Sequence, residues 1–151
     1  MKTLIIGIGN LLRSDDGIGL HIIEALRKEN IKSDVDLHEG LSSLDVLDSI
    51  KDYDRILIID AIRSSGSPGT VHKLSLEDLK EKGTAHSFSS HLNMDFTEML
   101  EVGRKIFPDR IPKDIIIIAV EAEDVTTISD RCTPKVEKAI PGIIQLIKEL
   151  I

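Results

Sequence analysis

The segment GIGNLLRSDDGIG, residues 7–19, lies between two hydrophobic stretches of different periodicity. The stretch before it, residues 3–8, is a largely apolar run rich in isoleucine, which is typical of a β-strand buried on both faces. The stretch after it carries Ile18, Ile22 and Leu26 at the spacing of one α-helical face. The segment therefore predicts a strand–loop–helix unit, the first step of an α/β domain.

The rest of the chain continues this alternation. Further strands are predicted at residues 35–39, 55–60, 70–74 and 114–120, and further helices at residues 41–50, 93–107 and 133–151, the last bent at Pro141. Only nine residues, 61–69, precede the fourth strand, whereas a parallel crossover needs about a dozen, so this strand is expected to be antiparallel and at an edge. Small polar residues at 83–90 predict a mobile loop. We expect one domain over residues 1–151, with three α/β/α layers around a five-stranded, mostly parallel sheet.

Composition and charge exclude several classes of function. A formal net charge of −7 argues against a nucleic-acid partner, which would require a basic face. Cys132 is the only cysteine, so neither an internal disulfide nor a cysteine-rich zinc site can form, and a reducing, cytoplasmic location is expected. The longest apolar run, residues 115–120, is far too short for a membrane span.

The glycines of residues 7–19 raise the question of a nucleotide site. A dinucleotide fingerprint, G-x-G-x-x-G, would be met by Gly7 and Gly9, but Leu12 stands where the third glycine is needed. Asp15 and Asp16 would repel a pyrophosphate at the following helix N-terminus, and Glu39 as a ribose ligand would not compensate for this. No P-loop is present either. We therefore expect no nucleotide cofactor.

A cation site fits the same loop better. Ligands of open α/β sheets bind beyond the carboxyl ends of the central strands, where Asp16 and Asp60 are both expected. Asp60 directly follows the apolar residues 56–59, whereas Asp16 fits a helix cap and a ligand equally well. Asp15 fits a pure cap or a solvated neighbour. Two carboxylates and one imidazole, with coordination positions left open, suit nickel or zinc.

The third ligand has to be chosen from five histidines. His21 is expected to be superficial or half-buried, and His38 and His72, on predicted strands, to be structural. His86 and His91 flank the sequence SFSS in the predicted loop. His91 is the better candidate because it is connected directly to the next helix.

At this point the residues carry a resemblance to a known family. Four segments together resemble the hydrogenase maturation proteases. They are GIGNLLRSDDGIG near the amino terminus, IIDAI at residues 58–62, SSH at 89–91 and TPKVEKAI at 133–140. The resemblance implies an endopeptidase that removes a C-terminal extension from the large-subunit precursor of a nickel–iron hydrogenase. It also implies a twisted five-stranded sheet with one antiparallel strand. One departure from the family is that residues 38–43 read HEGLSS where many members have DGGT. Which hydrogenase this chain would process is therefore left open.

The resemblance also implies the ligands and the partner. The family's metal-contacting trio corresponds to Asp16, Asp60 and His91, and the nickel is carried by the precursor. Whether the metal takes part in hydrolysis or only in recognition is left open, and an Asp16 or Asp60 carboxylate acting as general base also remains open. Cys132 has no placed histidine partner, so no thiol nucleophile is expected. The alternative to the protease is a non-catalytic assembly module that binds metal or precursor.

Overall fold

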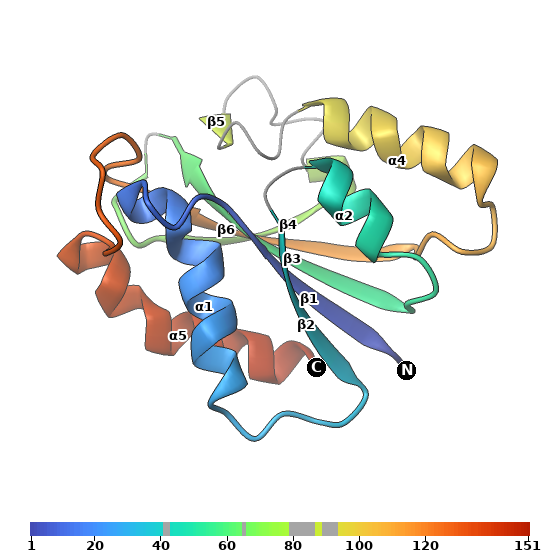
Figure 1. The fold of residues 1–151 in the computed structure, drawn as a ribbon, viewed down its shortest axis with the longest axis horizontal. Helices are drawn as coiled ribbons and strands as arrows, with labels where there is room; N and C mark the ends of the chain where they lie inside the picture. The colour runs from blue at the N-terminus through green and yellow to red at the C-terminus, as the bar shows by residue number, and fades with distance from the viewer. Residues whose placement is uncertain (41–42, 65, 79–86, 89–93) are drawn as a thin grey trace.

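The computed structural model describes residues 1–40, 43–64, 66–78, 87–88 and 94–151 (Figure 1). Its strands are β1 (Thr3–Ile8), β2 (Val35–Gly40), β3 (Arg55–Arg63), β4 (Val71–Ser75), β5 (Ser87–Phe88) and β6 (Asp114–Glu121). Its helices are the 3-10 turn η1 (Ser14–Gly17), α1 (Ile18–Arg27), α2 (Ser43–Ser49), α4 (Met94–Ile106) and α5 (Pro134–Leu150). The predicted alternation of strands and helices is confirmed.

The strands form a sheet in the order β2-β1-β3-β6-β4. β2, β1, β3 and β6 are parallel, and β4 pairs antiparallel with β6 at the edge, as the short connector predicted. The two-residue β5 pairs antiparallel with the end of β3. The chain moves to one side of β1 to form β2 and to the other side to form β3, so the strand order reverses between β1 and β3. In open α/β sheets such a reversal opens a crevice at the carboxyl ends of the strands.

Two hydrophobic cores lie on the two faces of the sheet. One contains alternate residues of the central strands, such as Ile58 and Ile117, with Val46 of α2 and Leu100 of α4. The other contains the intervening strand residues with the buried sides of α1 and α5. Helices α1 and α5 therefore cover one face and α2 and α4 the other, which gives the three predicted layers (Figure 1). Both faces of β1 and β3 are covered, which explains why their sequences are continuously apolar.

The structure corrects the predicted end of the third strand. β3 continues three residues past Asp60, because Ala61 and Ile62 pair with β6 and Arg63 pairs with β5. Asp60 therefore lies within the strand and not at its last position. Of the loop predicted at residues 83–90, Ser87–Phe88 form β5 and the remainder lies outside the described residues. Across the described parts of the chain, no helix has the length and apolarity that crossing a membrane requires.

Candidate active site

The glycines of residues 7–19 hold the loop and α1 tightly against the sheet. A Cβ atom at Gly7 would lie 2.2 Å from the carbonyl oxygen of Gly19, and one at Gly19 would lie 2.5 Å from that of Ile59. Gly9 has φ +150°, and a Cβ atom there would lie 1.9 Å from the carbonyl oxygen of Asp16. These contacts seat the loop across the carboxyl ends of β1 and β3, and Gly19 touches the residue that precedes Asp60.

Asp16 and Asp60 are both buried at this carboxyl edge. Asp16 is 4% exposed and lies inside η1; the N-cap of α1 is Gly17, so the interpretation of Asp15 or Asp16 as its cap is wrong. Asp60 is fully buried and follows Ile56 and Ile58 in the row of β3 residues that faces α2 and α4. The Ala61 N–H donates a 2.8 Å hydrogen bond to Asp60 Oδ1. Asp16, which follows β1, and Asp60, in β3, thus belong to segments on either side of the β1–β3 reversal, and their meeting at one ligand stays a prediction.

His91, the third predicted ligand, lies outside the described residues, as does His86. Within the described ranges no group of three histidine, cysteine or acidic side chains is placed to hold a metal ion. The trio Asp16, Asp60 and His91 therefore stays a prediction.

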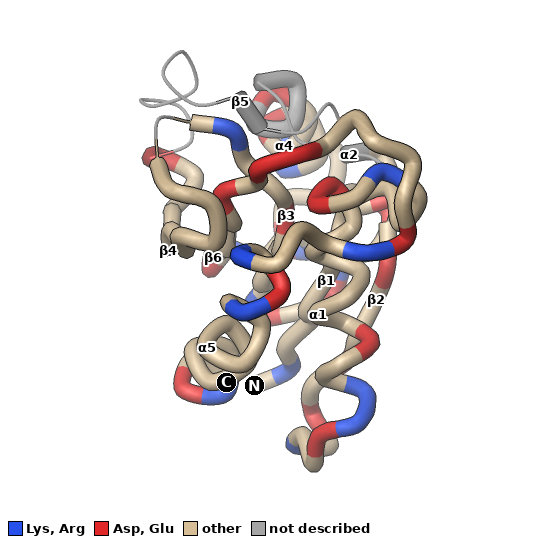
Figure 2. The backbone as a smooth tube through the Cα atoms, turned by 90° about the vertical axis from the view of Figure 1, so that its left-hand side faces the viewer, with Lys and Arg blue, Asp and Glu red and all other residues tan. Residues whose placement is uncertain are grey.

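Asp15 differs from its predicted role. It is fully buried, where a pure cap or a solvated neighbour was expected. Its carboxylate accepts hydrogen bonds from the main chain at Glu123, Asp124 and Thr133 and from the Thr133 hydroxyl. Asp15 therefore joins the first loop to residues 122–133, which lie beside it at the left of Figure 1; Figure 2 views the molecule from that side.

The thiol of Cys132 and the histidines at positions 21 and 72 lie in different surroundings. Burial, the negative charges of Asp15 and Glu137, and a hydrogen bond to Asp15 raise the pKa of the Cys132 thiol to about 12. Since the thiolate is the nucleophilic form, this thiol is unreactive at neutral pH, in line with the sequence interpretation. His21 is half-buried on α1, and His72 Nε2 lies 2.9 Å from Glu121 Oε1.

Glu121 is a fully buried acid that the sequence interpretation missed. It ends β6 opposite Ile62, on the same sheet face as Asp60, and its carboxylate accepts hydrogen bonds from the Ser64 N–H and hydroxyl and contacts His72. Burial by itself raises the pKa of Glu121, but the hydrogen bonds from Ser64 and His72 outweigh burial, so the pKa is lowered from its ordinary value. The signal was present in the sequence, because DIIIIAVE ends on an acid after an apolar run just as RILIID does.

Because the pKa of Glu121 is lower in the folded chain than in the unfolded chain, its contribution to stability is present above the unfolded value of 4.5 and is lost as pH falls through the folded value. We expect Glu121→Gln to lower the melting temperature near neutral pH, and the difference from wild type to shrink as the pH falls below 4.5. Thermal unfolding followed by circular dichroism measures both. Glu24→Gln, the same change on the exposed side of α1, is the matched control; a Glu121→Gln difference that stays constant with pH would contradict the assignment.

Comparisons with known proteins find similar chains that match nearly the whole length of this one. A family model described as hydrogenase maturation protease matches residues 20–150. The chain is 30% identical over 154 residues to the hydrogenase 2 maturation protease of Escherichia coli, covering 99% of this chain and 91% of that protein. It is 29% identical to a putative hydrogenase maturation protease of Methanocaldococcus jannaschii, covering 97% of this chain and 96% of the relative.

Solved structures with a similar fold come from the same group of proteins. The hydrogenase maturating endopeptidase HybD of Escherichia coli superposes with a TM-score of 0.82 at 29% identity, covering 97% of this chain and 90% of that chain. The [NiFe] hydrogenase maturation protease HybD of Thermococcus kodakarensis superposes with a TM-score of 0.81 at 26% identity, covering 99% of both chains.

Proposed function

Because this chain belongs to the hydrogenase maturation protease family, endopeptidases that process the large subunit of nickel–iron hydrogenases, we propose that it removes the C-terminal extension of such a precursor after nickel insertion. The precursor carries the nickel, which this chain recognises through Asp16, Asp60 and His91. In this proposal residues 1–151 act as one domain.

The observation that supports the proposal most is the burial of two carboxylates at one end of the sheet. Asp16 follows β1 and Asp60 lies in β3, and these strands flank the reversal in strand order. Carboxylate oxygens are common ligands of divalent metal ions, so two buried carboxylates at the same end of the sheet support a positively charged ligand there. Two carboxylates and one imidazole form an incomplete coordination shell, and the precursor's own ligands supply the remaining positions.

The proposed chemistry is hydrolysis of one peptide bond. Binding the precursor's nickel places the scissile carbonyl at the carboxyl edge of the sheet, beside Asp16 and Asp60. One of these carboxylates accepts a proton from a water molecule while the oxygen of that water bonds to the carbonyl carbon. The C–N bond then breaks, and the proton passes to the leaving amine. The thiol of Cys132, whose pKa is about 12, is not needed as nucleophile.

The test is cleavage of purified large-subunit precursor with and without nickel, followed by gel electrophoresis and mass spectrometry. Wild-type protein is expected to cleave only the nickel-loaded precursor. Asp16→Asn and His91→Ala are each expected to lower the cleavage rate by at least about 10³-fold, since each removes one of three ligands, with the circular dichroism spectrum unchanged.

Three results would contradict the proposal. Equal cleavage of nickel-free precursor would remove nickel recognition, and a wild-type rate for either variant would remove that residue from the trio. Precursor that binds but is never cleaved by wild-type protein would favour the assembly module instead.

A further inference from the structure

Asp15 is a buried acid that the proposed chemistry does not use. Its Oδ2 atom accepts hydrogen bonds from the N–H groups of Glu123 at 2.9 Å and Asp124 at 3.1 Å and from the Thr133 hydroxyl at 2.8 Å. Its Oδ1 atom accepts the Thr133 N–H at 2.7 Å. Both oxygens are therefore occupied by donors from one segment more than 100 residues away in the chain.

The main chain links the same two segments. Ser14 N–H donates to the Ser129 carbonyl at 2.9 Å, Asp15 N–H to the Asp124 carbonyl at 2.9 Å, and Ser129 N–H to the Leu12 carbonyl at 3.0 Å. Ser14 has φ +53°, a left-handed conformation that a residue with a side chain adopts only when its surroundings impose it. The shape of η1 therefore depends on residues 122–133.

Asp16 shares this turn with Asp15 and is held from both sides. On its amino side Asp15 is fixed by its hydrogen bonds, and on its carboxyl side the Asp16 carbonyl packs directly on Gly9. Rotation of the turn that moved Asp15 would also redirect Asp16, because the two residues are consecutive in one 3-10 turn.

We propose that Asp15 is a positioning residue: it anchors η1 to residues 122–133 and to the start of α5, and so orients the Asp16 carboxylate toward the carboxyl edge. This inference rests on the proposed function, in which Asp16 contacts the precursor's nickel. It makes residues 122–133 a support of the active site even if they never touch the substrate.

The test separates activity on the precursor from stability of the fold. An asparagine at position 15 has the same shape, but its amide N–H group would face an N–H or O–H donor of the partner segment. Asp15→Asn is expected to lower kcat/KM for nickel-loaded precursor about 100-fold, as misplacement of a reacting group by about 1 Å does, with KM rising as well as kcat falling because Asp16 also contacts the precursor's nickel. Thr133→Val removes only the hydroxyl donor and is expected to lower kcat about 3-fold with the fold preserved.

Two controls make the result specific. Ile147→Ala creates a cavity in the core between α5 and the sheet and lowers stability without touching η1, so it is expected to keep wild-type kcat at a temperature where it is folded. Asp16→Asn tests the site itself: a wild-type rate in that variant would overturn the proposed function. Loss of activity in Asp16→Asn together with wild-type kcat in both Asp15→Asn and Thr133→Val would overturn the positioning role alone.

Discussion

Asp60→Asn is expected to lose cleavage of nickel-loaded precursor by at least about 10³-fold while folding normally. Asparagine keeps the size of aspartate and one oxygen, so the hydrogen bond from the Ala61 N–H to this side chain can be retained. Asp60 is fully buried, and asparagine fills the same space without leaving a cavity, so the fold is expected to be kept. What is lost is the anionic oxygen that binds a cation or accepts a proton from water.

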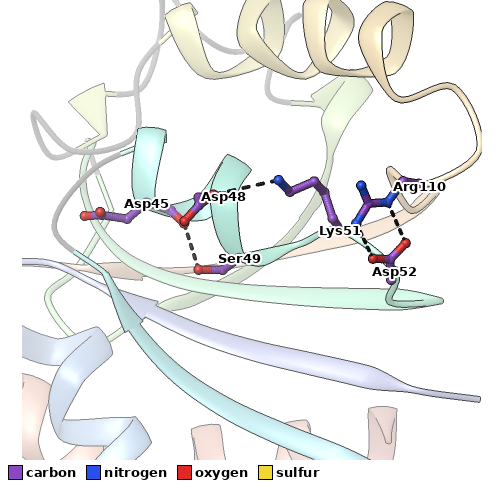
Figure 3. Close-up of polar contacts among 6 residues, drawn as sticks. All are labelled: Asp45, Asp48, Ser49, Lys51, Asp52 and Arg110. Atoms are coloured by element: carbon purple, nitrogen blue, oxygen red, sulfur yellow. Dashed lines mark hydrogen bonds and ion pairs between the residues drawn. The ribbon is translucent and has the colours of Figure 1, made fainter.

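The measurements are the cleavage rate and the melting temperature of the same preparation. Asp52→Asn is the matched control, because Asp52 forms two hydrogen bonds with Arg110 before the amino ends of β3 and β6, far from the carboxyl edge (Figure 3). That variant is expected to cleave at the wild-type rate. A folded Asp60→Asn variant that cleaves at the wild-type rate would remove Asp60 as a catalytic residue.

Gly19→Ala is expected to lower the free energy of unfolding by about 3 kcal/mol. A Cβ atom at this position would lie 2.5 Å from the Ile59 carbonyl oxygen, 2.7 Å from the Ile8 carbonyl oxygen and 2.8 Å from the Ile8 nitrogen. All three are main-chain atoms of central strands, which cannot move aside as the end of a flexible side chain can. Helix α1 would have to lift from the sheet, and the loop carrying Asp16 would lift with it.

Urea denaturation monitored by circular dichroism measures this loss. Gly142→Ala in α5 is the control, since no atom lies within 4 Å of its added Cβ atom and alanine favours the helix by about 1 kcal/mol. The two variants carry the same chemical change and are expected to shift the urea midpoint in opposite directions. An unchanged midpoint for Gly19→Ala would mean that the packing of α1 on the sheet tolerates an added methyl group.

The fold was predictable because its main signals are local. Continuous apolar runs such as Ile115–Val120 indicate strands covered on both faces, and the short connector after β3 leaves only an antiparallel return for β4. Part of the candidate site could be proposed from the sequence. Asp60 comes directly after an apolar run, and Asp16 lies between an apolar strand and an amphipathic helix. The end of β3 was not, because residues 61–63 extend the strand by pairing with β6 and β5, which are distant in the chain.

Asp15 and Asp16 show where the local information ends. Two adjacent aspartates before a helix have the same local sequence signature, and both were compatible with a helix cap. Only the folded chain brings residues 122–133 against the first loop, and this contact makes Asp15 an internal hydrogen-bond acceptor. Glu121 acquires its partners Ser64 and His72 in the same way. Residue patterns decide which segments become strands and helices because that choice depends on neighbours in the chain, whereas the role of a buried acid depends on donors that only tertiary packing delivers.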